Sequence, residues 1–191
     1  MSVIVIACEG NICRSPYVQF ALADALDRSG VHDHSVRSVG VRTVAGRPMF
    51  HRSSAALAAA GITGHESFRS SPATPALLAD ADLVLTMERW HRSSIVERVP
   101  RTLRRVFTLR EAARIASRAD LVADVAVTGG DVAAVLRRRR LDAITPDPVA
   151  DDIPDPVAGD AEAHAAFRRT ADDAVSALVP LIVACASGAA A

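Results

Sequence analysis

The chain of 191 residues contains no lysine, so all 22 of its basic residues are arginine. This absence excludes a nucleotide-binding loop of the Walker type, whose Gly-x4-Gly-Lys-Ser/Thr motif requires a lysine. Neither sign of charge dominates, because 22 acidic residues balance the basic ones. The overall charge therefore points to no nucleic-acid partner and to no membrane surface.

Cysteine is scarce as well, with three residues in the chain. An odd number of cysteines, with no basic secretory region before the apolar residues 2–7, predicts free thiols in a reducing cytoplasm and no disulfide framework. Histidines such as His32, His34 and His51 show no metal-ligand spacing. We therefore predict no metal site and no cofactor.

Residues 174–191 carry no charge, and their length alone would suit a membrane span. Pro180 and a content of alanine and serine in place of leucine argue against one. A packed terminal helix at about 160–184 is predicted instead, because six residues form one helical face. These are Phe167, Ala171, Ala174, Val175, Leu178 and Ile182.

The most informative motif lies between the first predicted strand, residues 2–7, and the first predicted helix. It reads Cys8-Glu9-Gly10-Asn11-Ile12-Cys13-Arg14-Ser15-Pro16. Gly10 and Asn11 tolerate positive φ, so the loop can curl and point its N–H groups at one place. Ser15 suits a helix N-cap and Pro16 the first helical position. The motif therefore predicts an anion site of phosphate size at a helix N-terminus.

Two side chains of this loop suit chemistry on a bound phosphoryl group. Cys8 offers a thiolate nucleophile, which the positive field of a helix N-terminus favours. Arg14 is permanently charged and forked, so it can bind two oxygens at once.

The motif closely resembles the signature Cys-x-Gly-Asn-x-Cys-Arg-Ser-Pro of the low-molecular-weight protein tyrosine phosphatases, particularly their bacterial members. Other segments along most of the chain resemble the same family. They are Ser38-Val39-Gly40, Gly61-Ile62-Thr63-Gly64-His65, Leu83-Val84-Leu85-Thr86-Met87-Glu88 with His91, and Ile153-Pro154-Asp155-Pro156.

The resemblance implies that Cys8 attacks phosphorus to form a cysteinyl-phosphate, and that Asp155 protonates the leaving oxygen and later activates water. It implies that the Ser15 hydroxyl stabilises the thiolate. The phosphate-binding residues it implies are Glu9, Gly10, Asn11, Ile12, Cys13, Arg14 and Ser15.

Three further roles are implied by the resemblance. Ser38 and His65 would hold Asn11 by hydrogen bonds. Cys13 would act as a redox partner that forms a reversible disulfide with Cys8.

The general acid has two candidates, because one pentapeptide occurs twice. It appears as Pro146-Asp147-Pro148-Val149-Ala150 and as Pro154-Asp155-Pro156-Val157-Ala158. We favour Asp155, since Gly159-Asp160 and the terminal helix follow it at the distance usual in the family. Asp147 remains the alternative.

The apolar periods predict a single α/β domain over residues 1–191. They indicate a three-layer, doubly wound sheet of about four parallel strands, with helices on both faces and the phosphate-binding loop after the first strand. The predicted strands are 2–7, 35–39, 83–87 and 106–109. The predicted helices are one ending near Gly30, then 52–60, 76–79, 88–99 and 160–184.

An insertion at about 111–150 departs from the family pattern. It contains a predicted helix at about 131–140 that ends in the run Arg137 to Arg140. We interpret this run as a solvated helix C-terminus, where cations suit the dipole, and not as a nucleic-acid site.

The pocket wall departs from the family as well. Val157-Ala158 follow the Asp-Pro pair where phosphotyrosine-selective members carry an aromatic residue, and residues 43–46 contain none. Phe50 is the nearest aromatic candidate. A small aliphatic wall is therefore predicted, with a phosphotyrosine protein or a small aryl phosphate as substrate.

The residues together predict a metal-independent phosphomonoesterase of the protein-tyrosine-phosphatase type, with no nucleic-acid or membrane partner. Arsenate reduction by the same loop is the alternative; it would need an external thiol, because Cys185 is the one cysteine beyond Cys13. A non-catalytic phosphate-binding module would not require Cys8 and Asp155. The oligomeric state is left open.

Overall fold

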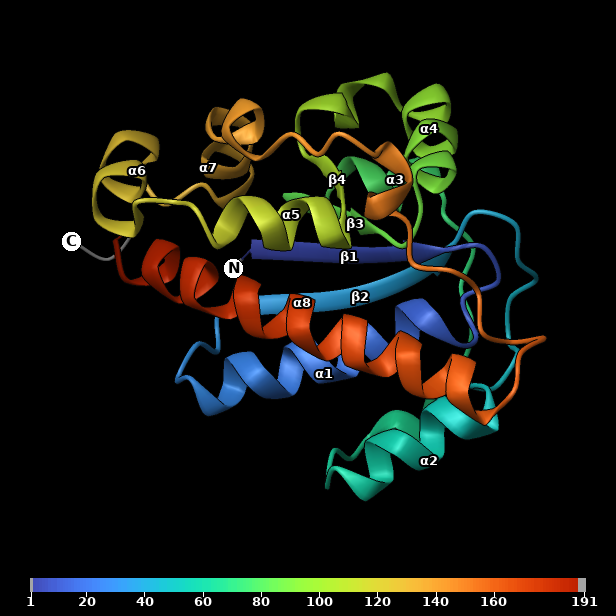
Figure 1. The fold of residues 1–191 in the computed structure, drawn as a ribbon. Helices are drawn as coiled ribbons and strands as arrows, with labels where there is room; N and C mark the ends of the chain where they lie inside the picture. Colours follow the sequence, from blue (N-terminus) through green and yellow to red (C-terminus); the bar gives the residue numbers. More distant parts are fainter. Residues whose placement is uncertain (1, 189–191) are drawn as a thin grey trace.

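Four parallel strands form one sheet in the order β2-β1-β3-β4 (Figure 1). The computed structural model describes residues 2–188. The strands are β1 Ser2–Cys8, β2 His34–Gly40, β3 Leu83–Thr86 and β4 Val106–Thr108. The helices are α1 Arg14–Arg28, α2 His51–Ala59, α3 Pro75–Ala79, α4 Arg89–Arg98, α5 Leu109–Ala116, α6 Leu121–Thr128, α7 Val132–Arg138 and α8 Ala161–Gly188. Short 3-10 helices cover His65–Ser67, Pro100–Arg104, Arg140–Ala143 and Pro148–Asp151.

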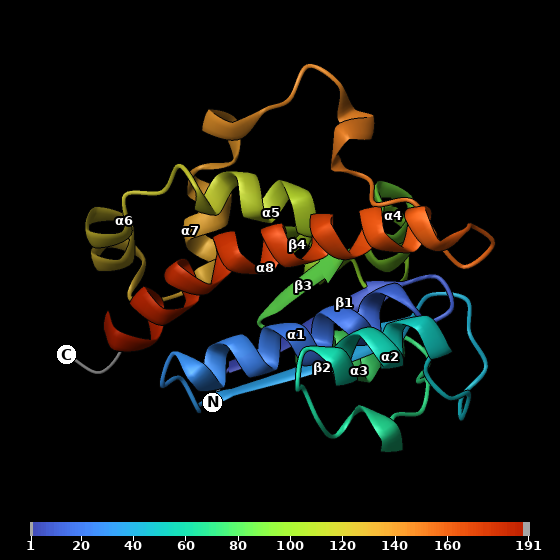
Figure 2. The same ribbon diagram turned by 60° about the horizontal axis from the view of Figure 1, so that its bottom comes forward.

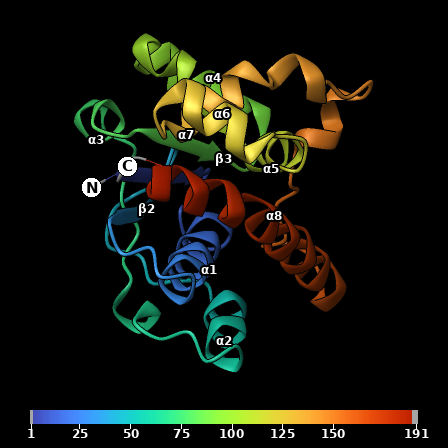
Figure 3. The ribbon, with the colours of Figure 1, turned by 90° about the vertical axis from the view of Figure 1, so that its left-hand side faces the viewer.

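Strand β1 runs through the centre of the sheet with both faces covered, as its Val- and Ile-rich sequence predicts. Successive side chains of a strand point to opposite faces. Ile4 and Ile6 belong to the core shared with α1, α5 and α8, whereas Val5 and Ala7 belong to the core shared with α3 and α4. Figure 3 shows the resulting three layers.

The strand register brings the carboxyl ends of three strands to one edge of the sheet. Cys8 pairs with Gly40 of β2, and Ala7 pairs with Thr86 of β3. The loops that follow β1, β2 and β3 therefore leave the sheet side by side. Ligands of doubly wound sheets bind at such an edge.

The predicted α/β class with a parallel sheet is confirmed, and each predicted strand agrees with the observed one within one residue at either end. The fourth strand ends at Thr108, one residue before its predicted end at Leu109. Leu109 instead begins α5, a helix that was not predicted. A capping box marks that start: Thr108 Oγ1 accepts from the Glu111 N–H, and the Glu111 carboxylate accepts from the Thr108 N–H.

Residues 117–150 form more structure than the one helix predicted for them. α6 is an additional helix, and α7 ends at Arg138, short of the predicted boundary at residue 140. Val125, Val135 and Leu136 join the main core. In Figure 2 the segment between α7 and α8 arches back from α7 towards α4.

The run Arg137 to Arg140 is not simply solvated, so that interpretation is wrong for most of it. Arg138 and Arg139 bind the buried carboxylate of Asp124, at 3.2 and 2.7 Å. Arg140 Nε lies 2.7 Å from Glu111 Oε1, and its guanidinium stands over the Phe107 ring. Arginine stems cover apolar surface while their heads pair with acids, and a sequence pattern does not show those distant acids.

Helix α8 is long and apolar enough to cross a membrane by length and composition alone. In the fold it packs against α1 and α5. All six residues of its predicted inner face are buried, and Phe167 meets Tyr17 edge-on with ring centroids 5.4 Å apart. The position of α8 in the core accounts for its apolar face.

The Glu111 carboxylate, 7% exposed, is shared by Arg92, Arg140 and the α5 cap. Glu111→Ala leaves two guanidinium groups without their acid and removes half of a capping box. We expect it to lower the free energy of unfolding by about 2 kcal/mol or more. Urea unfolding measures this. Glu97→Ala, at an exposed position of α4, should change it by less than about 0.5 kcal/mol; equal effects would contradict the role given to Glu111.

Candidate active site

The loop between β1 and α1 curls around the Cys8 sulfur. Asn11 adopts a left-handed conformation with φ 49°, as predicted. Gly10 does not adopt positive φ, and a Cβ there would meet Ile12 only at an ordinary 3.7 Å. The expectation for Gly10 is therefore wrong, because Asn11 alone reverses the chain.

The start of α1 also differs from the sequence prediction. The helix begins at Arg14, and its N-cap, Cys13, makes no side-chain cap. Ser15 is thus not the N-cap, and Pro16 is not the first helical residue. The physical reason is that the Ser15 hydroxyl is occupied elsewhere: it lies 3.0 Å from Cys8 Sγ.

Cys8 is buried at 2% exposure, with two donors directed at its sulfur. The Asn11 backbone N–H donates to Sγ at 3.3 Å. Ser15 Oγ already accepts from Asn11 Nδ2 at 2.9 Å, so its own proton is available to Sγ. These two donors can stabilise negative charge on the sulfur wherever the reaction develops it.

The side chain of Asn11 ties this loop to two others. Its amide nitrogen donates to Ser15 Oγ and to Ser38 Oγ, each at 2.9 Å, and its oxygen accepts from the Ser71 N–H at 2.8 Å. Ser38 is therefore placed as expected. The other partner is the Ser71 backbone, and not His65.

His65 does not hold Asn11, contrary to the prediction. Its ring is buried next to Phe20, and its Nδ1 lies 3.2 Å from Ser54 Oγ. The hydrogen bonds of the Asn11 side chain run to Ser15, Ser38 and the Ser71 N–H, and none of them involves His65. The contact with Ser54 instead links the 3-10 helix His65–Ser67 to α2.

Arg14, at 1% exposure, is the most enclosed charge of the site. Its Nη1 donates to Glu88 and to the Ile153 carbonyl oxygen, the latter at 2.8 Å. Its Nη2 donates to Asp155 Oδ2 at 2.8 Å. Nε is buried with no partner among residues 2–188. Nε and the second hydrogen of Nη2 therefore form a fork for two phosphoryl oxygens.

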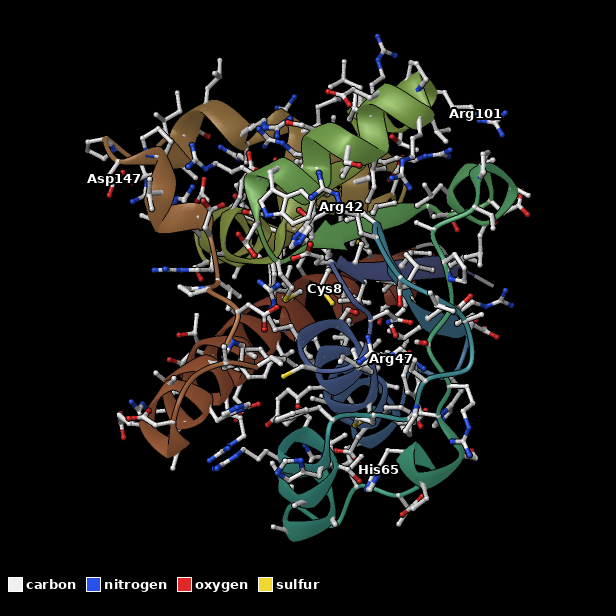
Figure 4. The ribbon with its side chains drawn as sticks, turned by 90° about the vertical axis from the view of Figure 1, so that its right-hand side faces the viewer. Cys8, Arg42, Arg47, His65, Arg101 and Asp147 are labelled. Atoms are coloured by element: carbon white, nitrogen blue, oxygen red, sulfur yellow. The ribbon has the colours of Figure 1, made fainter. Side chains whose placement is uncertain are left out.

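The structure separates the two general-acid candidates. Asp155 lies against Arg14, with its other oxygen accepting from the Val157 N–H at 3.1 Å. Asp147 makes the same local turn with the Val149 N–H, at 2.9 Å, but Figure 4 shows it at the outer edge of the molecule, far from Cys8. Of the two carboxylates, Asp155 is the one brought to the loop.

Glu88 is a residue of the site that sequence reasoning missed. Besides Arg14, its carboxylate accepts from Trp90 Nε1 at 3.0 Å, and its N–H donates to His91 Nδ1 at 3.0 Å. Burial, with the nearby Arg14, lowers the pKa of His91 to about 3, so this ring is a neutral acceptor. The available signal was an acid directly after the strand that neighbours β1.

The rim of the site is more aromatic than predicted. Phe50, whose N–H donates to the Ile12 carbonyl oxygen at 2.6 Å, stacks on His164 with ring centroids 5.2 Å apart. Arg42 stands 4.8 Å over the Trp90 ring. Elements distant in sequence thus bring rings to the loop, and the aliphatic wall expected from Val157-Ala158 stays a prediction for the side next to Asp155.

The Cys13 thiol contacts α2. Its Sγ lies 3.3 Å from Ser53 Oγ, and burial raises the pKa of its thiol to about 11. Both Cys8 and Cys13 are free thiols in the structure. The redox role of Cys13 stays a prediction.

Comparison with known sequences agrees with this geometry. The family described as low molecular weight phosphotyrosine protein phosphatase matches residues 3–131. A protein-arginine-phosphatase of Bacillus subtilis is 35% identical over 109 residues, which cover 56% of this chain and 70% of that protein. A probable low molecular weight protein-tyrosine-phosphatase, EpsP, of Ralstonia nicotianae is 35% identical over 108 residues, with the same coverage of 56% and 70%.

Solved structures share the fold. A YwlE mutant from Bacillus subtilis superimposes with a TM-score of 0.69 at 25% identity, over 94% of this chain and 97% of that one. A low molecular weight protein tyrosine phosphatase from T. tengcongensis has a TM-score of 0.69 at 20% identity, over 94% and 99%. The second shows a likeness of fold alone.

We expect Asp155→Ala to lower kcat for phenyl phosphate by about 10²-fold or more, because the leaving oxygen loses its acid. The loss should be smaller with para-nitrophenyl phosphate, whose leaving group needs less protonation. Asp147→Ala is the matched control from the duplicated pentapeptide and should leave kcat unchanged. A loss confined to Asp147→Ala would transfer the role to Asp147.

Glu88→Gln should lower kcat by about tenfold or more, because Arg14 loses a charged partner that sets its orientation. Competitive inhibition by inorganic phosphate should change less, since removing a negative charge also removes repulsion of the anion. Glu88→Asp should recover part of kcat. An unchanged kcat in folded Glu88→Gln would show that Glu88 does not position Arg14.

Proposed function

The chain belongs to the low-molecular-weight protein tyrosine phosphatase family, and we propose that it is a protein-tyrosine-phosphatase working through a cysteinyl-phosphate. The observation that carries the proposal is the convergence of Cys8, Arg14 and Asp155 on one loop at the carboxyl edge of the sheet. A module that only bound phosphate would need neither the sulfur nor the acid.

In the first step the Cys8 thiolate attacks phosphorus, and the S–P bond forms as the P–O bond to the leaving group breaks. Asp155 gives its proton to the leaving oxygen. The loop N–H groups and the free edge of Arg14 bind the remaining oxygens, whose charge is greatest in the transition state.

In the second step water attacks phosphorus and Asp155 takes its proton. The S–P bond breaks, which releases phosphate and returns the thiolate. The Ser15 hydroxyl and the Asn11 N–H stabilise the sulfur each time its charge reappears. No step requires a metal ion.

The rim favours phosphotyrosine over phosphoarginine. The Arg42 guanidinium at the rim would repel a substrate that carries a guanidinium of its own, and Glu9 lies 4.0 Å from Arg42, so that acid is already engaged. An uncharged phenol ring suits the Phe50–His164 stack and the Trp90 edge. The same rim would admit a small aryl phosphate.

The position of Cys185 supports hydrolysis over arsenate reduction by an internal relay. Cys185 is buried at the far end of α8, where burial raises the pKa of its thiol to about 11. A relay thiol would have to attack the Cys8–arsenic adduct as a thiolate, forming a disulfide with Cys8 while arsenic is reduced, and a thiol held protonated is unsuited to that attack. The proposed setting is the cytoplasm, where Cys8 stays reduced.

The test is hydrolysis of para-nitrophenyl phosphate at pH 5 to 7 with EDTA present, by the wild type and by Cys8→Ser. We expect turnover without metal that Cys8→Ser abolishes. A phosphotyrosine peptide should exceed the matched phosphoarginine peptide in kcat/KM by about tenfold or more.

Two results would contradict the proposal. If folded wild type shows no turnover, the phosphatase proposal is wrong, and arsenate reduction with an external thiol becomes the function to test. Faster hydrolysis of the phosphoarginine peptide would make the chain an arginine phosphatase, like its Bacillus subtilis relative.

A further inference from the structure

A cavity of about 700 Å³ lies at the opposite end of the sheet from Cys8. Its apolar floor includes Ile4 and Leu83 at the starts of β1 and β3, with Ala133 of α7 and Cys185 of α8. In Figure 1 α6 and α7 stand at the amino end of β1, and Figure 4 shows Arg101, which lines the cavity, well separated from Cys8.

Four arginines line this cavity: Arg101, Arg104, Arg105 and Arg137. Within residues 2–188 none of them has a carboxylate partner. Arg105 Nη2 donates to the Ala79 carbonyl oxygen at 2.8 Å, and Arg137 Nη1 to that of Arg104 at 3.4 Å. These backbone contacts hold two of the stems and leave every guanidinium charge uncompensated.

The acids in the lining are mostly committed to the backbone. Asp82 accepts from the Val3 N–H at 2.8 Å. Asp131 accepts from the Ala134 N–H at 3.0 Å as the cap of α7. With Asp33, three carboxylates stand against four guanidinium groups, so the lining carries an excess of one positive charge.

Two buried nitrogens of the lining have no partner in the described part of the chain. They are Arg105 Nε and His34 Nδ1. Burial lowers the pKa of His34, so its ring is neutral at pH 7 and offers a hydrogen bond without adding charge. Buried polar groups are almost always paired in native proteins, so these two point to a missing partner: an acceptor for Arg105 Nε and, in the Nδ1–H tautomer, for His34 as well.

We propose that this cavity is a second binding site, which takes a small organic anion: a carboxylate, sulfonate or phosphate carried on an apolar body. The anionic group would lie among the four guanidinium groups, where charge-assisted hydrogen bonds are strongest. The apolar body would cover the floor formed by the strand starts and α8. A bare inorganic ion would leave that floor uncovered.

Calorimetric titration with naphthalene-2-sulfonate and with octane-1-sulfonate tests the site. The full chain is used with its active site saturated by vanadate, so that neither probe binds at Cys8. Saturable 1:1 binding of at least one probe is expected, and the pair distinguishes an aromatic body from an aliphatic one.

Variants locate the binding. Arg104→Ala combined with Arg137→Ala should weaken it by about tenfold or more. Arg37→Ala combined with Arg69→Ala removes the same charge outside the cavity and should leave it unchanged. Ala186→Phe fills the cavity without altering charge and should also weaken binding. This variant tests the site if the Arg104→Ala, Arg137→Ala double variant does not fold.

Absence of saturable binding to wild type would overturn the proposal, as would equal binding by the cavity variants. Turnover of para-nitrophenyl phosphate is measured on the same samples without vanadate. Arg104, Arg137 and Ala186 line the cavity at the far end of the sheet from the catalytic loop, so the turnover of these variants should be unchanged. Failure of the proposed phosphatase function and failure of the proposed anion site can thus be told apart, because turnover and sulfonate binding are measured separately.

Discussion

The burial of the Arg14 guanidinium is the constraint on which the rest of the site depends. A charge at 1% exposure is tolerated only where acceptors surround it. Those acceptors are Glu88 after β3, and the Ile153 carbonyl and Asp155 before α8. The first loop is therefore complete only when the sheet and the segment leading into α8 are in place.

The absence of lysine shapes how charge is handled throughout the molecule. A planar guanidinium can serve two acceptors, and one carboxylate can serve two guanidinium groups. Glu111 is shared by Arg92 and Arg140, and Asp124 is shared in the same way at the end of α7. The Glu111–Arg140 pair fastens residues 117–150 to α5, and the Asp124 pairs join α6 to the end of α7. Arg14 likewise serves two acids.

The two ends of the parallel sheet have different chemistry. At the carboxyl end the loop N–H groups, Cys8 and Arg14 form a site closed by protein acceptors. At the amino end the arginines form no ion pair in the described part of the chain, and two of the three nearby carboxylates accept from backbone N–H groups. The helices α6 and α7 add the walls of that second region.

The sequence by itself determined the loop that carries Cys8 and Arg14 and the parallel α/β class with its four strands, because each is a local pattern. Cys8 and Arg14 belong to one continuous motif, and the Val- and Ile-rich strands need no distant partner to be identified. The α5 capping box was also local, so that helix could have been predicted from Thr108 and Glu111.

Only the tertiary structure brings Asp155, and not Asp147, to Arg14, since both lie in the same pentapeptide and form the same turn. It also selected Glu88 for Arg14 and the Ser71 N–H, in place of His65, for Asn11. These contacts join residues far apart in the chain. Their geometry depends on how the loops leave adjoining strands, which local propensity does not encode.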